Sequence, residues 1–293
     1  MNRFLFLFLL LTGTLSAQEL SYGFEVGLNF SSFNGPSEMA DDGTNLEMFS
    51  STNGFHVGGN LRLKFVDRFG VKAEILFSQK GGKNIYDGEG IQIFEATDDS
   101  KILSEGTRKT IISVTNSYID IPLVAYFRPV SRIEIFGGAN IGFLINSTGF
   151  GEFTYNGRTS LGGDNIDFIA ELDHNYKRDE ARSASTVEDF EEVISFDVDG
   201  KEVVFPASLS AYYLDYETKE GNLYNVFDLG LVGGAHFYFN GSLYLGVRLN
   251  YGLLDVTNNT YDISFTESNG VEYIPRSDID RNFSLQASLG FSF

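Results

Sequence analysis

The sequence predicts an all-β fold: a transmembrane, antiparallel, up-and-down β-barrel of eight strands with short periplasmic turns and long extracellular loops. Large apolar residues alternate with small or polar ones in eight separate segments, as they do from Phe283 to Phe293. An export signal precedes these segments, and short connections alternate with long ones. Because alternation gives a strand one apolar and one polar face, eight such segments suit a barrel wall that faces lipid.

The N-terminus has the features of a secretory signal peptide. A positively charged start is followed by an apolar run at 4–11, which is too short to cross a bilayer as a helix of about 20 residues. Small residues before Gln18 predict cleavage there, with a cut after Ser16 as the alternative. We expect residues 1–17 to be removed and 18–293 to form one barrel domain in the outer membrane.

The eight strands are predicted from runs in which every second residue is apolar. In chain order they cover 20–33, 53–66, 69–80, 117–129, 132–147, 224–239, 242–255 and 281–293. No charged residue falls on an apolar face, and a charge facing lipid at mid-depth costs about 2–4 kcal/mol. The apolar faces run, strand by strand, from Tyr22 to Phe30, Phe55 to Phe65, Phe69 to Phe77, Ile119 to Phe127, Ile133 to Ile145, Phe227 to Phe239, Leu243 to Leu253 and Phe283 to Phe293.

The connections predict which end of the barrel faces outward. Asp67-Arg68, Pro129-Val130-Ser131 and Asn240-Gly241 are tight turns, and such turns face the periplasm in outer-membrane barrels. The predicted extracellular loops are 34–51, 81–115, 150–222 and 256–281. These loops hold 32 of the 40 acidic residues and 12 of the 21 basic residues. Acidity concentrated in the loops argues against a nucleic-acid partner.

The segment at about 150–222 is a large extracellular insertion, too long for an unstructured connection. Within it, the alternation from Val193 to Phe205 predicts a β-hairpin that turns at Asp199-Gly200. If this hairpin joined the wall, the barrel would have ten strands. Its acidic and basic residues suit solvent better, so we expect it to project above the membrane.

Charged residues lie opposite the apolar faces and are predicted to form a luminal charge network. They are Glu25, Arg62, Lys64, Lys72, Glu74, Asp120, Arg128, Glu134, Asp228 and Arg248. An eight-stranded barrel is only wide enough for side chains to fill its interior. Because acids and bases are balanced, ion pairs are favoured over a selectivity ring of one sign. A plugged barrel is therefore predicted, and a small-solute porin or channel is the alternative.

Several segments resemble a known family. They are 27–31 (GLNFS), 118–123 (YIDIPL), 228–235 (DLGLVGGA), 244–255 (YLGVRLNYGLLD) and 283–293 (FSLQASLGFSF). They resemble the PorT-type "porin family" of outer-membrane β-barrel proteins of Gram-negative bacteria, although the 150–222 insertion is longer than that family usually carries. The resemblance implies an integral outer-membrane barrel near protein secretion. Phe293 likewise resembles the C-terminal assembly signal that the barrel-assembly machinery recognises.

The sequence offers little evidence of catalysis. His56 and His236 lie on polar faces of strands, where a hydrogen-bonded luminal histidine is expected. Asp173-His174 lies in the insertion, and adjacent residues seldom form a working dyad without a third positioned group. The motif Asp197-x-Asp199-Gly200 lacks the later ligands of a calcium loop, so a hairpin turn explains it.

We therefore predict a non-enzymatic outer-membrane scaffold or interaction protein that displays acidic extracellular loops. No catalytic residue, cofactor or metal site is predicted. The expected partners are outer-membrane lipid, the barrel-assembly machinery, and a protein or polysaccharide at the extracellular loops. A small-solute porin remains the alternative function.

Overall fold

The computed structural model describes residues 19–159, 163, 165–177, 193–206, 208–209, 222–260 and 262–293. The predicted signal peptide at 1–17 lies outside the described residues. So do several parts of the predicted insertion at 150–222, among them 178–192 and 210–221. In the described part of the chain, no helix is long and apolar enough to cross a membrane.

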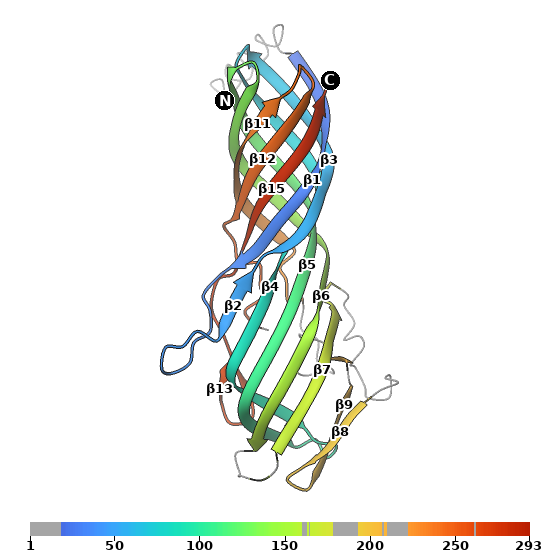
Figure 1. Cartoon of the computed structure of the whole chain (residues 1–293), viewed down its shortest axis with the longest axis vertical. Coiled ribbons are helices and arrows are strands. Elements are labelled where there is room, and N and C mark those ends of the chain that lie inside the picture. The colour runs from blue at the N-terminus through green and yellow to red at the C-terminus, as the bar shows by residue number, and fades with distance from the viewer. Residues whose placement is uncertain are drawn as a thin grey trace, which may run out of the picture.

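Eight strands form the barrel wall (Figure 1). They are β1 (Glu19–Asn34), β3 (Thr52–Val66), β4 (Phe69–Glu95), β5 (Lys101–Val130), β6 (Ile133–Thr159), β11 (Phe227–Tyr238), β12 (Leu243–Gly252) and β15 (Arg281–Ser292). Each strand is antiparallel to the next along the chain. β15 also pairs with β1, from Gly23↔Ser292 to Asn34↔Arg281, which closes the ring. The predicted eight-stranded, antiparallel barrel is confirmed.

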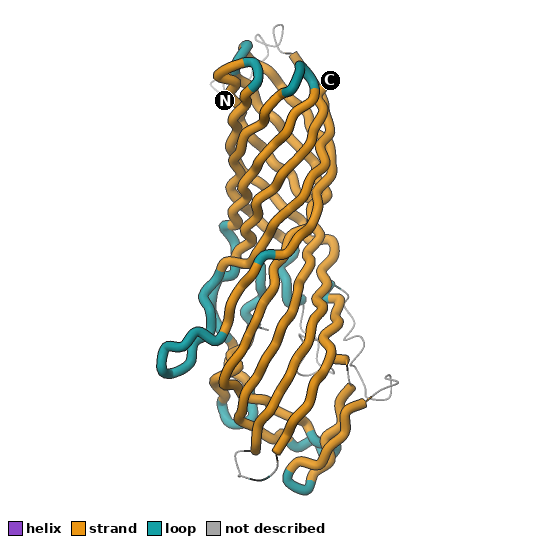
Figure 2. The backbone as a smooth tube through the Cα atoms, in the orientation of Figure 1, coloured by secondary structure: helices purple, strands orange, loops and turns teal. Residues whose placement is uncertain are grey.

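The tight connections lie at one end of the barrel, which we call the turn end (Figure 2). The pair Val66↔Phe69 places the first turn at Asp67-Arg68, as predicted. The pair Val130↔Ile133 places the second turn one residue later than predicted, at 131–132. At the third turn, the Asn240 side chain accepts hydrogen bonds from the backbone N–H groups of residues 242 and 243, both at 2.8 Å.

Three wall strands continue far beyond the barrel at its other end. β4 and β5 stay paired as far as Glu95↔Lys101, so the prediction of a loop at 81–115 is wrong. β7 (Asn165–Asn175) pairs with the outer part of β6, from Thr148↔Asn175 to Arg158↔Asn165. We call this outer part the extension sheet; it consists of residues 81–95, 101–115, 147–159 and 165–175. The short strands β2 (Glu47–Ser50) and β10 (Ser208–Leu209) pair with β4 and β7.

The extension sheet has an apolar core on its inner side. Phe94, Phe153, Tyr155 and Phe168 are buried there together with smaller apolar residues. Val203 of the insertion hairpin packs against the same core. Alternation therefore continues past the barrel, but apolar side chains turn inward because water now surrounds the outer face. This reversal explains why a search for outward apolar faces predicted a loop at 81–115.

The hairpin predicted in the insertion is confirmed outside the barrel wall. β8 (Val193–Val198) and β9 (Lys201–Pro206) form a separate two-stranded sheet, so the ten-strand alternative is wrong. At its turn, Asp199 and Gly200 have positive φ angles of 54° and 77°, as a two-residue hairpin loop requires. The Gly200 N–H donates to Asp197 Oδ1 at 2.8 Å, so the Asp-x-Asp-Gly motif serves a turn. A second small hairpin, β13 (Ile263–Ser268) and β14 (Tyr273–Pro275), lies between β12 and β15.

The barrel wall has its apolar face outward and its polar face inward. Outward residues on the predicted apolar faces are exposed, such as Leu28 at 58% and Ile75 at 64%. Charged and amide side chains on the opposite face are buried. Because lipid surrounds the wall and cannot hydrogen-bond, this arrangement is the one that the barrel prediction requires.

Candidate functional site

The charges that the sequence predicts for the lumen differ in burial. Lys64 and Arg128 lie at the rim of the turn end, where their side chains are 38% and 31% exposed. Lys64 forms an ion pair with Glu19, so it belongs to a rim contact rather than to the buried network. The other predicted residues are almost fully buried inside the barrel: Glu25, Arg62, Lys72, Glu74, Asp120, Glu134, Asp228 and Arg248.

Near the turn end, Glu134 on β6 forms the centre of a cluster. Arg62 on β3 donates from Nη1 to Glu134 Oε2 at 2.9 Å, and Arg128 on β5 donates from Nε to the same oxygen at 2.8 Å. His236 Nδ1 on β11 lies 2.9 Å from Glu134 Oε1. The Tyr238 hydroxyl accepts hydrogen bonds from both arginines, at 2.6 and 2.9 Å. One carboxylate therefore connects strands on several sides of the lumen.

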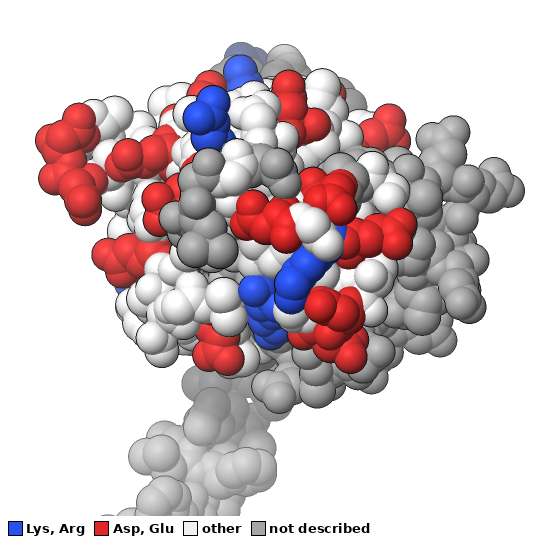
Figure 3. All heavy atoms as spheres, turned by 90° about the horizontal axis from the view of Figure 1, so that it is seen from below, with Lys and Arg blue, Asp and Glu red and all other residues white. Residues whose placement is uncertain are grey.

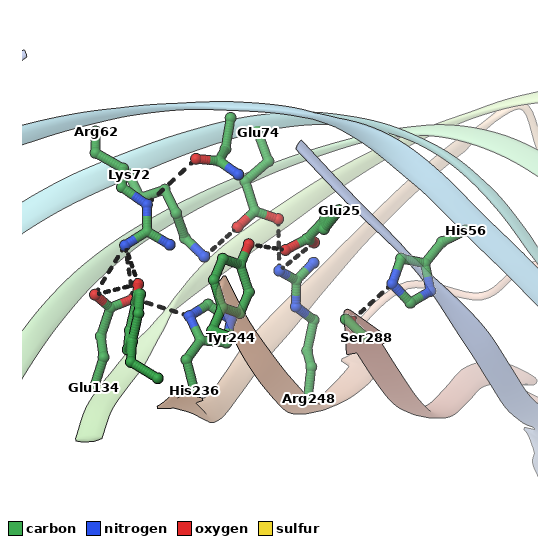
Figure 4. Close-up of polar contacts among 12 residues, drawn as sticks. Glu25, His56, Arg62, Lys72, Glu74, Glu134, His236, Tyr244, Arg248 and Ser288 are labelled. Atoms are coloured by element: carbon green, nitrogen blue, oxygen red, sulfur yellow. Dashed lines mark hydrogen bonds and ion pairs between the residues drawn. The ribbon is translucent and has the colours of Figure 1, made fainter. Parts of the chain in front are cut away.

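In the middle of the barrel, Arg248 on β12 spans the lumen (Figure 4). Its Nη2 donates to Glu25 Oε1 on β1 at 3.0 Å and to Glu74 Oε2 on β4 at 2.6 Å. β12 and β4 lie on opposite sides of the ring, because the same number of strands separates them in either direction. Lys72 Nζ lies 2.5 Å from Glu74 Oε1, and the Tyr244 hydroxyl donates to Glu25 Oε2 at 2.9 Å.

Toward the extension, Lys80 on β4, which is not among the predicted luminal charges, forms a third cluster. Its Nζ lies 2.9 Å from Asp120 Oδ1 on β5 and 3.7 Å from Asp228 Oδ2 on β11. Asn140 donates to Asp120 Oδ1 at 3.0 Å, and Asn282 donates to Asp228 Oδ2 at 2.9 Å. With Lys80 in place of Lys64, and with Arg128 counted through its ion pair with Glu134, the network still has five acids and five bases.

Aromatic rings fill the space between the charged clusters. Tyr238 and Tyr244 are almost fully buried, and the Tyr244 ring centroid lies 4.4 Å from that of His236. A glycine makes room for them, since a Cβ atom at Gly290 would lie 2.1 Å from Tyr244 Cζ. These rings and the glycine occupy inward-facing positions of β11, β12 and β15. The alternation of these strands could therefore have identified them as luminal residues.

The other luminal histidine, His56, resembles a catalytic base in its contacts but not in its surroundings. Its Nε2 lies 2.8 Å from Ser288 Oγ, and its Nδ1 lies 2.6 Å from Asn29 Oδ1. His56 and Asn29 are fully buried, so a substrate cannot reach this group. His174 lies on β7 opposite Gly149, but its side chain is not among the described ones, and the absence of catalysis there stays a prediction.

The luminal arrangement can hold strands together without an excess of either charge. Each buried acid faces a base or a hydrogen-bond donor from another strand. Removing one member of a buried ion pair leaves an uncompensated charge, at a cost of about 3–5 kcal/mol. The network therefore links distant parts of the wall, from β1 to β12 and from β3 to β6.

Acidic side chains gather on the outer end of the extension (Figure 3). Hydrogen bonds from Ser100, together with Lys201, lower the pKa of Asp98 in the β4–β5 turn to about 2. Lys201 Nζ lies 3.1 Å from Asp98 Oδ2, which connects the β8–β9 hairpin to this turn. Hydrogen bonds from Thr44 also lower the pKa of Asp42. Both aspartates are therefore ionised at neutral pH.

Solved structures similar to this chain are outer-membrane proteins of low sequence identity. Ail of Yersinia pestis is 10% identical with a TM-score of 0.33, covering 94% of this chain and 99% of Ail. Neisserial surface protein A is 9% identical with a TM-score of 0.33, at the same coverages. OprG of Pseudomonas aeruginosa is 12% identical with a TM-score of 0.32, covering 92% of this chain and 95% of OprG. The comparison with curated proteins gave no match.

The family of the chain is shown by a match to a family model. The model described as "Outer membrane protein beta-barrel domain" matches residues 16–258, which includes most wall strands and the insertion. This match agrees with the closed ring of eight strands and its outward apolar face. The protein is therefore a member of the outer membrane protein beta-barrel domain family and resides in the outer membrane.

Proposed function

We propose that this protein is a non-enzymatic interaction protein whose plugged barrel supports an extracellular β-sheet for partner binding. The observation that carries the proposal is the continuity of β4 and β5, which stay paired from Phe69↔Phe127 in the barrel to Glu95↔Lys101 at the outer tip. A continuous ladder transmits the rigidity of the barrel to the extension. The acidic outer surface then suits a basic protein segment, or a polysaccharide bridged by cations.

The contents of the lumen favour a plug over a pore. Arg248 reaches from β12 to Glu74 on the opposite wall, and its side chain is only 3% exposed. The Glu134 and Lys80 clusters occupy the lumen on either side of it. A selectivity filter usually has a ring of one charge sign, whereas these three clusters together hold five acids and five bases. The alternative, a small-solute porin, requires a water path past all three clusters.

Conductance measurements distinguish the two functions. Purified, refolded protein is inserted into planar lipid bilayers, and we expect no reproducible ion-conducting steps. Steps in the wild type that disappear in Arg248→Trp, a bulky neutral replacement, would overturn the plugged barrel. The replacement Val247→Trp is the matched control, because Val247 is the neighbouring lipid-facing residue and should leave any current unchanged.

Site-specific crosslinking tests the binding surface. A photoreactive amino acid is placed in the full-length protein at Glu95, which is exposed at the outer tip, and at Asn240, which is exposed in a turn of the opposite end. We expect a discrete crosslinked product in intact cells at position 95 and a different pattern at position 240. Identical patterns, or no product at position 95, would contradict a partner at the extension.

Two finer parts of the proposal rest on the resemblance alone. PorT-type membership, with a role near protein secretion, is supported by the segments at 118–123, 228–235 and 244–255. Deleting the gene tests it: a secretion role requires cargo proteins to accumulate in the periplasm, and unchanged secretion would remove that role. Recognition of Phe293 by the barrel-assembly machinery is likewise a proposal.

A further inference from the structure

Three aspartates meet at the outer mouth of the barrel, in the connection between β12 and β15. Asp278 and Asp280 lie two residues apart just before β15. The Arg276 N–H donates to the Asp262 carbonyl oxygen at 2.8 Å, which brings Asp262, the residue before β13, to the same place. One carboxylate oxygen from each aspartate lies within 4.8 Å of the other two.

Within the described part of the chain, each of these aspartates keeps one buried oxygen that receives no hydrogen bond. The oxygens are Asp262 Oδ2, Asp278 Oδ1 and Asp280 Oδ1. Arg276 faces the other oxygens of two of them, at 2.5 Å from Asp278 Oδ2 and 4.0 Å from Asp262 Oδ1. Asp280 is only 8% exposed, and its second oxygen receives one long hydrogen bond, at 3.4 Å, from Thr257. Because a buried carboxylate oxygen without a partner is unfavourable, the cluster lacks positive charge.

Arg276 does not supply enough charge. Its Nη1 also lies 2.9 Å from Glu47 Oε2, so one guanidinium is shared among several carboxylates. Three carboxylates, those of Glu47, Asp262 and Asp278, therefore share the single guanidinium of Arg276.

We propose that Asp262, Asp278 and Asp280 form a binding site for Ca²⁺. The donors are all carboxylate oxygens, which hard divalent cations prefer. Oxygens that lie within 4.8 Å of one another can contact one such ion. Ca²⁺ accepts irregular sets of oxygen ligands, whereas Mg²⁺ demands near-octahedral geometry, so this irregular connection suits Ca²⁺ better. Asp262 and Asp278 are partly exposed, which leaves room for water ligands.

A cation here would fasten the outer loops to the barrel. Asp280 directly precedes β15, and Asp262 directly precedes β13. Arg276 continues the contact through Glu47 to β2, and Glu47 Oε1 accepts a hydrogen bond from Asn84 of β4 at 2.6 Å. The ion would therefore fix the β13–β14 hairpin against the base of the extension sheet. This inference is independent of whether the lumen conducts.

Calorimetry of the full-length, refolded protein tests the site. After chelator treatment, titration with CaCl₂ should show one saturable site, and MgCl₂ should bind at least about tenfold more weakly. Asp262→Asn and Asp280→Asn should each weaken Ca²⁺ binding at least about tenfold, since each removes a charged ligand. Both replacements keep the shape of the side chain and reduce repulsion, so folding should be retained. Glu272→Gln, an exposed acid in the same connection, should bind Ca²⁺ like the wild type.

Limited proteolysis gives a second readout that does not depend on the heat of binding. Ca²⁺ should slow tryptic cleavage after Arg276 in the wild type and in Glu272→Gln but not in Asp280→Asn. The proposal is wrong if the wild type shows no saturable Ca²⁺ binding. It is also wrong if the asparagine variants bind Ca²⁺ as tightly as the wild type. Uptake of one proton near neutral pH without any cation effect would instead identify an acid pair that shares a proton.

Discussion

β4 passes through two surroundings, and its side chains are arranged oppositely in each. In the barrel, Lys72 and Glu74 point inward while Ile75 faces lipid. In the extension sheet, the inward positions hold Tyr86 and Phe94, which are buried, and the outward positions hold acids such as those at 87 and 89. The geometry of the strand is unchanged, but the solvent on its outer face changes from lipid to water. The position of this reversal therefore marks the outer edge of the membrane along the strand.

The apolar side chains of β6 also change from outward in the barrel to inward in the extension sheet, and a one-residue bulge accompanies the change. The β5–β6 register shifts between Ser117↔Asn146 and Tyr118↔Leu144, so Ile145 has no partner of its own. Inward residues are even-numbered before this bulge, such as Glu134, and odd-numbered after it, such as Phe153. A bulge changes which residues face inward without interrupting the sheet. The barrel and the extension are thus two differently solvated parts of one continuous sheet.

The largest expected effect comes from breaking the luminal network. Arg248→Met leaves Glu25 and Glu74 buried without their shared partner, so we expect a loss of about 3–5 kcal/mol in the free energy of unfolding. Denaturant titration of the refolded protein in lipid vesicles, followed by heat-modifiable gel mobility, measures it. The double variant Arg248→Met, Glu25→Gln, which keeps Glu74 as the partner of Lys72, should recover much of the loss. A single variant as stable as the wild type would show that the ion pairs do not support the wall.

A new charge on the outer face of β5 tests where the membrane ends. Leu123→Arg places a charge among lipid-facing residues at the middle of the barrel, where Leu123 pairs with Ala73 and Ala139. We expect it to cost about 2–4 kcal/mol. Thr107→Arg lies on the outward side of the same strand in the extension sheet, where water solvates the charge and little stability should be lost. If Leu123→Arg and Thr107→Arg lose equal stability in the same denaturant titration, the proposed change from lipid to water along the outer face of β5 is contradicted.

A substitution in the apolar core of the extension sheet should destabilise the extension without destabilising the barrel. Phe153 packs edge-on against Phe168 with ring centroids 5.3 Å apart, and the Arg108 guanidinium lies 4.1 Å from its centroid. Phe153→Leu should cost about 1–2 kcal/mol locally. Hydrogen exchange should accelerate in the extension strands but not in the barrel. Phe150→Leu is the control, because Phe150 is on the same strand and 67% exposed; equal acceleration in both variants would contradict an inner core.

Alternation alone predicts the wall and much of the luminal network, but not the pairing within it. Lys80 has the same parity as Lys72 and Glu74 and lies within the predicted strand at 69–80, so the alternation also assigns it to the lumen. By contrast, Arg248 and Glu74 are 174 residues apart, and their contact depends on the closure of the ring. Residue parity assigns a side chain to a face, and the topology then determines its neighbours.

The three-aspartate cluster shows the same limit outside the membrane. Asp278 and Asp280 are close in sequence, but Asp262 joins them through a backbone hydrogen bond from Arg276. Irregular connections carry no alternation, so nothing in the sequence pattern predicts which carboxylates meet. The extension sheet was missed for a different reason: its alternation is present, but with the apolar side inward.

The smallest expected effect on stability is at Phe293. Its two possible roles, ring packing in the folded barrel and a signal for barrel assembly, can be separated. Its N–H donates to the Tyr22 carbonyl oxygen at 2.8 Å, and its ring stacks on Tyr22 at 5.2 Å between centroids. Phe293→Ala keeps the backbone bond and loses the ring contact, so the refolded barrel should lose about 0.5–1.5 kcal/mol. If Phe293 is also an assembly signal, the amount of folded barrel in cell membranes should fall far more than this loss explains. Tyr22→Ala removes the same ring contact while keeping Phe293, and it should lower stability without lowering assembly. Equal assembly of the two variants would leave Phe293 with a packing role alone.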